Sequence, residues 1–184
     1  MAVHYIQPYD KNTPPNIGGS INSAIKQLNT DPDDFICLLD HDVLFLRPDS
    51  KKQLEEILET TDFHILGVAT NRLAISHQLV PGMFCVTDIR DHIKCANAMH
   101  EANYGNVFEI NDILAAFCLC FKVSTWNKLG GFHENSLQFD SLFSAAARRS
   151  KMKLGIMTGI YVFHAYRLMS DNPKQDITHL LRGQ

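Results

Sequence analysis

Short apolar runs alternate with amphipathic segments along most of the chain. Residues 3–6 are predicted to form a strand. Residues 35–39 form a continuous apolar run, which is typical of a strand covered on both faces. Between these runs, apolar residues at helical spacing from Ile17 to Leu28 predict a helix, and a proline-rich loop precedes it. The chain is therefore expected to begin with strand, loop, helix and strand.

The same alternation continues along the rest of the chain. Ser50 and Gln53 form a capping-box pattern ahead of another amphipathic helix. A strand is predicted over 63–69 and a helix over 88–103, with Ile89, Ile93 and Ala96 facing inward and Gly105 ending the helix. A central strand is predicted over 114–123, a short helix over 124–129 and a longer helix over 137–150. Residues 154–164 are predicted to form one strand or a hairpin.

Strands that alternate with helices indicate the α/β class, and we expect one Rossmann-like domain with a mostly parallel central sheet flanked by helices. The length of 184 residues fits one domain with an elaborated loop or tail. The domain is predicted over residues 1–167, and the polar segment 168–184 is expected to be a lid, a docking helix or a disordered tail. Ligands of such sheets bind beyond the carboxyl ends of the strands, so function is expected there.

Charge and hydropathy exclude some classes of function. The formal net charge of −3 argues against binding of nucleic acid or an anionic membrane through positive charge over the whole surface. No apolar run approaches the roughly 20 residues of a membrane span, and the first residues lack the pattern of a signal peptide. A cytoplasmic location is expected.

The five cysteines are an odd number without a CxxC pair, so reduced core residues are the first interpretation. Cys118 and Cys120 share one face of a predicted strand, and a metal or redox pair there is the alternative.

Two carboxylates, Asp40 and Asp42, follow directly after the apolar run of residues 35–39. Like charges this close raise each other's pKa unless a cation lies between them. Oxygen ligands of this kind favour Mg²⁺ or Mn²⁺, whereas the alternative is that both residues cap the next turn. His164 ends another apolar run and is followed by Arg167, which suggests a third ligand and a guanidinium for a phosphate. The alternative for His164 is a histidine satisfied within the core.

Five segments in order carry a family resemblance. They are Pro8-Tyr9-Asp10, the glycine-rich helix start from Gly18 to Asn22, the Asp40-His41-Asp42 motif, the segment Trp126-Asn-Lys-Leu-Gly-Gly-Phe-His-Glu134, and His164-Ala-Tyr-Arg167. Together they resemble the nucleotide-sugar glycosyltransferases of the GT-A fold, in particular the family 2-like group, in a minimal version. The resemblance covers about residues 3 to 167.

This resemblance implies a glycosyltransferase of the inverting type that uses Mn²⁺ or Mg²⁺ and moves a sugar from a UDP- or GDP-sugar to an unidentified acceptor hydroxyl. Asp42 and His164 would hold the metal, with Asp40 assisting or contacting the ribose. Arg167 would neutralise the leaving diphosphate. Asp140 would be the general base, with Glu134 as second candidate and capping of its own helix as the alternative role of Asp140. The implied substrate-binding residues are Pro8, Tyr9, Asp10, Asn22, His41 and Arg167.

Two departures from the family pattern concern the nucleobase and the base motif. Family members have two strand–helix units before the acidic strand, and here only one fits, so Asp10 is the candidate for reading the nucleobase. The acidic pair of the base motif is reduced to Phe139-Asp140, which leaves the stereochemical outcome open.

Two other functions stay open at this stage. A phosphatase of haloacid-dehalogenase type also has Asp-x-Asp after an apolar strand, but it requires a hydroxyl residue where Leu44 stands. The other alternative is a non-catalytic domain that binds a nucleotide sugar or a partner protein.

Overall fold

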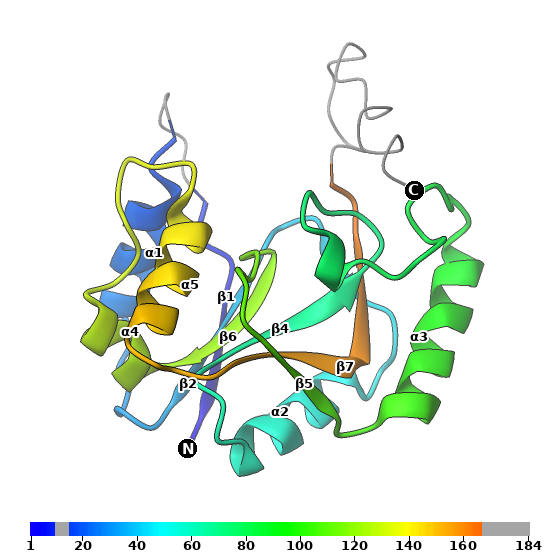
Figure 1. Cartoon of the computed structure of the whole chain (residues 1–184), viewed down its shortest axis with the longest axis horizontal. Coiled ribbons are helices and arrows are strands. Elements are labelled where there is room, and N and C mark those ends of the chain that lie inside the picture. The colour runs from blue at the N-terminus through cyan, green and yellow to red at the C-terminus, as the bar shows by residue number, and fades with distance from the viewer. Residues whose placement is uncertain (10–14, 167–184) are drawn as a thin grey trace.

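Seven strands form one mixed sheet in the computed structural model, which describes residues 1–9 and 15–166. In sheet order they are β1 (Val3–Ile6), β2 (Phe35–Leu39), β6 (Cys118–Lys122), β4 (Ile65–Thr70), β7 (Leu154–His164) and β3 (Val43–Phe45), and β5 (Val107–Ile110) also pairs with β7. The α/β class is confirmed (Figure 1). The predicted tail, 168–184, lies outside the described residues.

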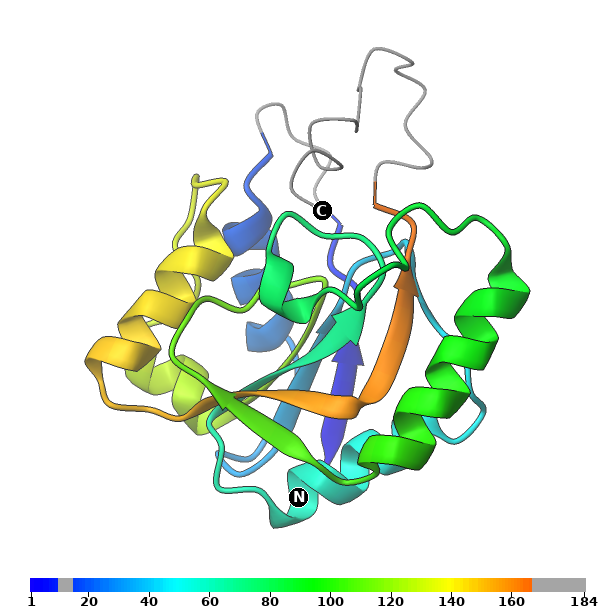
Figure 2. The same cartoon turned by 45° about the vertical axis from the view of Figure 1, so that its right-hand side comes forward.

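The expectation of a mostly parallel sheet is wrong. Only the β1–β2 and β4–β7 pairs are parallel, and the other four pairs are antiparallel. The main reason is that β6 lies between β2 and β4 and runs against both. Because β6 is antiparallel to both β2 and β4, these two strands run in the same direction. β1 is parallel to β2 and β7 is parallel to β4, so all four strands share that direction. In Figure 2 the arrowheads of β1, β4 and β7 point to the same end of the sheet.

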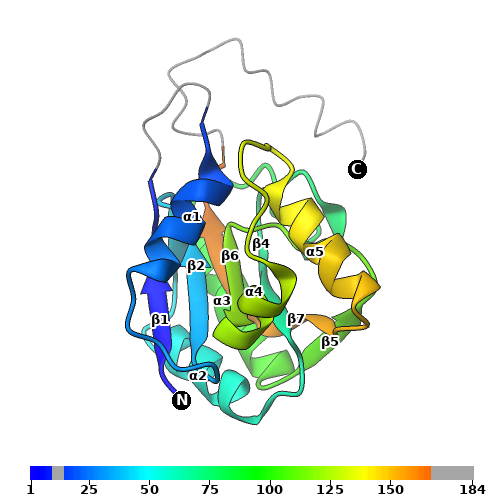
Figure 3. The ribbon, with the colours of Figure 1, turned by 90° about the vertical axis from the view of Figure 1, so that its left-hand side faces the viewer.

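Helices cover both faces of the sheet: Figure 1 shows the helices on its two sides, and Figure 3 looks onto one helix-covered face with the strands behind it. One face carries α1 (Ile17–Lys26), α4 (Val123–Leu129) and α5 (Phe139–Arg149), and the other carries α2 (Ser50–Thr60) and α3 (Ile89–Asn103). A short 3₁₀ turn, η1 (Ser76–Gln78), lies in the long connection between β4 and α3. None of the described helices has the length and apolar character needed to cross a membrane.

The alternation of side chains along β2 explains this three-layer arrangement. Phe35, Cys37 and Leu39 pack in the core under α2, whereas Ile36 and Leu38 pack in the core under α1, α4 and α5. All five positions are buried, which confirms the prediction of a strand covered on both faces. A central strand of this kind holds whatever follows its carboxyl end in a fixed position.

Several local predictions are corrected. Ser50 and Gln53 do not form a capping box, because Asp49 is the N-cap and its side chain makes no capping bond. Ile89 and Ile93 are exposed, and Ala96 alone of the three predicted inward residues is buried in the core. The predicted strand over 114–123 begins only at Cys118. The edge strand β5 was not predicted.

β7 is one continuous strand and not a hairpin. Its first half pairs with β5 and its last residues pair with β3, while β4 runs parallel to most of its length. The register against β4 shifts between Val68 and Ala69, and β7 bends there (Figure 2). The bend directs His164 towards the carboxyl end of β2.

The interpretation of the cysteines as reduced core residues holds for Cys37, Cys118 and Cys120, which are free and buried. Cys37 lies directly opposite Cys120 in the β2–β6 ladder. Cys85 is exposed and Cys95 is half-buried, so the interpretation does not extend fully to these two.

Candidate metal centre

Asp40, Asp42 and His164 converge at the carboxyl end of the sheet. One ligand atom from each residue lies within 4.8 Å of the other two. Nε2 of His164 is 3.3 Å from Oδ1 of Asp42 and 3.8 Å from Oδ2 of Asp40. Within residues 1–9 and 15–166, no other set of three histidine, cysteine, aspartate or glutamate side chains converges in this way. The sequence-based prediction that these three residues meet is therefore confirmed.

The turn between β2 and β3 brings the two carboxylates to this position. The amide of Asp40 donates to the carbonyl of Phe117 (2.8 Å), and the amide of Val43 donates back to the carbonyl of Asp40 (3.3 Å). After the turn, Val43 is paired with His164 in the β3–β7 ladder. The amide of Ala165 donates to the carbonyl of Asp42 (3.0 Å), so the end of β7 is tied to the acidic turn.

The His164 imidazole is held in one orientation. It is 3% exposed and stacks on Phe117, with ring centroids 5.1 Å apart. Its Nδ1 lies 2.9 Å from the carbonyl oxygen of Arg72, and its main-chain amide donates to Oδ1 of Asn71 (2.8 Å). Because a carbonyl only accepts, Nδ1 carries the proton when the ring is neutral, and the lone pair of Nε2 faces the two carboxylates. A hydrogen bond at the other ring nitrogen is typical of histidines that ligate metals.

The pKa values of the two carboxylates are shifted in opposite directions. Burial in the concave site raises the pKa of Asp40 to about 6, although half of its side chain is exposed; the charge of Asp42 acts in the same direction, and His164 opposes both. When the His164 ring is protonated, its Nε2 donates a hydrogen bond to Asp42, and this bond lowers the pKa of Asp42. Asp42 is therefore the carboxylate that is ionised most readily in this pair.

Two carboxylate oxygens and one imidazole nitrogen form a donor set that fits a divalent cation. Carboxylate oxygens are preferred by magnesium and manganese, and a neutral imidazole nitrogen is accepted by most transition metals. Burial and the charge of Asp42 both raise the pKa of Asp40, so the charges of this group are not in balance when both carboxylates are ionised and the ring is neutral. A cation between them would restore that balance, so the group is a candidate metal centre.

A cavity of about 480 Å³ lies beside the candidate metal centre. Asp40 and His164 line this cavity, and Asp140 lines it from the first turn of α5. The charge of Asp140 contributes to the raised pKa of Asp40. Oδ1 of Asp140 also accepts the amide of Ser141 (2.7 Å), so its expected role as a base and its local role at the helix start are both compatible with its position.

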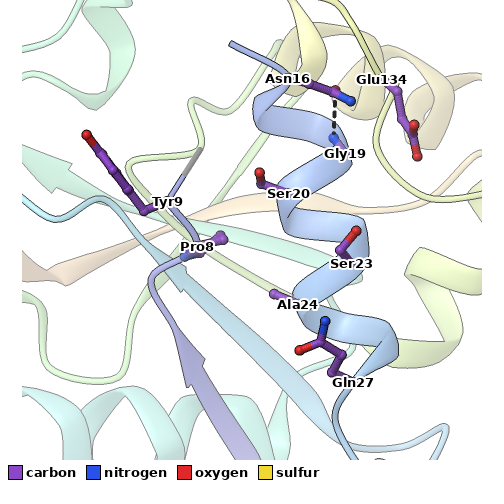
Figure 4. Close-up of a pocket in the computed structure, with 9 residues that line it drawn as sticks. All are labelled: Pro8, Tyr9, Asn16, Gly19, Ser20, Ser23, Ala24, Gln27 and Glu134. Carbon is purple, nitrogen blue, oxygen red and sulfur yellow. Dashed lines mark hydrogen bonds between the residues drawn. The ribbon is translucent and has the colours of Figure 1, made fainter. Parts of the chain in front are cut away.

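A second cavity, of about 450 Å³, lies between α1 and the end of β1. Pro8, Tyr9 and Glu134 line it, together with the exposed face of α1 (Figure 4). Glu134 therefore lines a different cavity from Asp40 and His164. The ring of Tyr9 meets the ring of His41 edge-on, with centroids 6.2 Å apart, so the second cavity adjoins the acidic turn.

Asn22 is buried, and its amide joins α1 to the segment after α4. Its Oδ1 accepts from the amide of Phe132 (2.8 Å) and from Nε1 of Trp126 (3.1 Å). Its Nδ2 donates to the carbonyl of Phe132 (2.8 Å) and to Oε1 of Glu134 (3.3 Å). A Cβ atom on Gly18 would collide with the carbonyl of His133. Two of the motifs that carry the resemblance thus pack against each other, and a direct role of Asn22 in substrate binding stays a prediction.

Two of the predicted site residues, Asp10 and Arg167, lie outside the described residues. Two residues of the site were missed, namely Asn71 and Arg72, which hold His164. The segment 71–87 gave no clear pattern of secondary structure. A usable signal was present, because this polar pair directly follows the apolar run that forms β4.

Comparison with known proteins gives no assignment: no protein-family model matches the chain, and a search of curated proteins finds no significant match. What is established is an α/β domain with a mixed seven-strand sheet and a candidate metal centre formed by Asp40, Asp42 and His164.

Proposed function

We propose that this protein is a metal-dependent glycosyltransferase that moves a sugar from a nucleoside-diphosphate donor to an acceptor hydroxyl. The observation that carries the proposal is the convergence of Asp40, Asp42 and His164 beside a cavity that also contains the carboxylate of Asp140. A cation site supports binding of a pyrophosphate, and a separate carboxylate in the same cavity supports proton transfer.

Asp42 and His164 would hold the cation, with Asp40 as the third ligand. When bound, a divalent cation such as Mn²⁺ or Mg²⁺ supplies positive charge that stabilises a diphosphate leaving group. The hydrogen bonds from His164 to Arg72 and Asn71 keep the imidazole in place without further rearrangement. Arg167, three residues beyond His164 in the chain, is the proposed guanidinium for the diphosphate.

The two cavities suggest an orientation for the substrates. We assign the nucleoside to the cavity lined by Pro8 and Tyr9, next to His41. The acceptor then enters the other cavity, which is lined by Asp140. Asp140 would accept the proton of the attacking hydroxyl, a contribution on the order of 10²–10⁴-fold. Glu134 is the less favoured base, because it lines the cavity that we assign to the nucleoside.

Binding of donor and metal provides the first test. UDP-, GDP-, ADP- and CMP-sugars are added with and without Mn²⁺, and thermal unfolding is followed. A ligand that binds only the folded state at 100 times its Kd stabilises by about 2.7 kcal/mol. We expect one donor to raise the unfolding temperature only when Mn²⁺ is present, and Asp42→Asn to abolish the effect.

The matched control is Glu59→Gln, which removes an exposed carboxylate from the last turn of α2. It should respond as the parent does. If Asp42→Asn retains the full Mn²⁺-dependent response, the metal site is misplaced and the proposal fails. Release of nucleoside diphosphate then distinguishes an enzyme from a binding domain, and release of inorganic phosphate from a phosphomonoester would favour the phosphatase alternative.

A further inference from the structure

The cavity beside the metal centre is lined by a few polar groups and by many apolar side chains. Asp40, Asp140 and His164 are among the polar groups. The apolar side chains come from several separate segments of the chain and include Ile17, Leu73, Ile75, Ile113, Phe117, Leu137 and Phe139. A few polar groups in a largely apolar cavity of this size are typical of a site for a small molecule.

Part of this apolar lining is open to water. Leu137 is 74% exposed, and Ile75, Ile113 and Phe139 are only half-buried. Leu137 and Phe139 lie within the three residues before Asp140, so one short segment supplies both apolar surface and a carboxylate to the cavity. An apolar ligand would remove this surface from water, at roughly 25 cal/mol for each Å².

The two cavities differ in chemistry. The cavity next to Tyr9 is walled by the hydroxyls of Ser20 and Ser23, the amide of Gln27 and the carboxylate of Glu134 (Figure 4). Such a wall suits a ligand with many hydroxyl groups. The cavity next to Asp140 has few such groups, and Ser141 is its one hydroxyl side chain besides that of Tyr166 among the described lining residues.

Charge narrows the class of ligand further. No lysine or arginine is among the described residues that line the Asp140 cavity, and two carboxylates face it. A phosphate or carboxylate group placed against Asp140 would meet like charge, and no lysine or arginine among the described lining residues would offset it. A neutral hydroxyl is instead a suitable hydrogen-bond donor to a carboxylate.

We propose that the acceptor is a neutral alcohol whose hydroxyl is carried on an apolar aromatic or aliphatic body, which lies against Leu137, Ile75 and Ile113. This inference rests on the proposed function and names its acceptor class. The hydroxyl points to Asp140, and the apolar body occupies the remainder of the cavity. A free sugar, a polyol or a phosphorylated acceptor fits this cavity less well.

Binding of three probes tests the proposal without turnover. Benzyl alcohol, glycerol and phenyl phosphate are compared by saturation-transfer NMR on the full chain. Benzyl alcohol is neutral and apolar, glycerol is a polyol, and phenyl phosphate combines an aromatic ring with charge. We expect a signal with benzyl alcohol that far exceeds the signals with the other two probes.

Two variants locate the binding. Leu137→Ser removes apolar surface from the cavity wall and should weaken benzyl alcohol binding by about tenfold, since 1.4 kcal/mol corresponds to a factor of ten. Ala74→Trp introduces a large ring from an exposed position on the same wall and should abolish binding. The control is Leu142→Ser, which changes a partly exposed leucine of α5 outside the cavity lining, and it should bind as the parent does.

The results separate this inference from the proposed function. If Leu137→Ser and Ala74→Trp bind benzyl alcohol as well as Leu142→Ser does, or if glycerol or phenyl phosphate is preferred, the apolar acceptor is excluded. That conclusion would hold even with a normal Mn²⁺-dependent donor response. Conversely, the parent protein could bind benzyl alcohol but show no Mn²⁺-dependent stabilisation by any nucleotide sugar. That result would refute the proposed glycosyltransferase function and leave only a cavity that binds apolar alcohols.

Discussion

Nδ1 of His164 lies 2.9 Å from the carbonyl oxygen of Arg72, a residue 92 positions earlier in the chain. This contact, together with the bond from the His164 amide to Asn71, joins the ends of β7 and β4. Both strands run in the same direction, so their carboxyl ends lie side by side. The orientation of the imidazole is thus determined by the sheet itself.

Asn71 is predicted to act as a positioning residue for His164. Asn71→Ala removes the acceptor of the His164 amide and of the Thr70 hydroxyl, both of which are buried. We expect a loss of about 1–3 kcal/mol in the free energy of unfolding and a loss of about 10–100-fold in Mn²⁺ affinity. Urea unfolding without metal and calorimetric Mn²⁺ titration measure the two effects. Unchanged Mn²⁺ affinity in a folded Asn71→Ala protein would show that this contact does not position the ligand.

Asn22 is predicted to stabilise the packing of α1 against the segment after α4. Asn22→Ala leaves the amide and carbonyl of Phe132 without their buried partner, and also the ring nitrogen of Trp126. We expect a loss of about 2–3 kcal/mol in the free energy of unfolding. The control, Asn127→Ala, changes an exposed asparagine on α4 and should stay within about 0.5 kcal/mol of the parent. Equal stability of the two variants in urea would contradict this role.

A buried histidine–tyrosine pair joins α3 to β7. Nε2 of His92 lies 3.0 Å from the carbonyl of Val86, so it carries the proton when the ring is neutral, and the Tyr161 hydroxyl donates to Nδ1 (2.6 Å). Tyr161→Phe leaves Nδ1 buried without a donor, and we expect a loss of about 1–2 kcal/mol. Tyr104→Phe removes an exposed hydroxyl that bonds Glu56 and should change stability by less than about 0.5 kcal/mol. Denaturant unfolding of both variants decides between these outcomes.

Asp34 is predicted to make stability depend on pH in the acid range. Hydrogen bonds from the Ala2 amide, from His4 and from the Asp31 amide lower the pKa of Asp34 from 3.8 to about 2. A carboxylate with a lowered pKa in the folded state stabilises the protein above about pH 4, and this contribution is lost as pH falls towards 2.

Asp34→Asn should therefore be less stable than the parent at pH 7, and the difference should shrink between about pH 4 and pH 2. Asp33→Asn changes the exposed neighbouring carboxylate and serves as the control. Unfolding curves of the three proteins across this pH range are the measurement. A difference that stays constant down to pH 2 would show that ionisation of Asp34 is not its source.

Much of the site was predictable because ionisable residues stand where the apolar runs of two strands end. The buried run of β2 stops at Asp40, and the run of β7 stops at His164, so the local pattern shows where a buried strand meets solvent. Since β2 and β7 run in the same direction, these ends meet. The roles of Asp140 and Glu134 stay predictions, although their assignment to different cavities favours Asp140.

The order and direction of the strands were not predictable in this way. A largely apolar strand such as β6 is covered on both faces whether its neighbours are parallel or antiparallel, so its composition does not reveal its direction. The edge strand β5 has an exposed Phe108 and an exposed Glu109, so it lacks the pattern of a buried strand. Asn22 shows the same limit for side chains, since its partners lie 104 to 112 residues away in the chain.

The pairing of β3 with the last residues of β7 has a further consequence for assembly of the protein. The acidic turn forms early in the chain, whereas the imidazole arrives only when the final described strand has docked. A polypeptide interrupted before residue 164 would have both aspartates and no nitrogen ligand. Tight binding of Mn²⁺ would then indicate that β7 has paired with β3 and β4. The ion would link the turn after β2 to the end of β7 and so stabilise the docked strand.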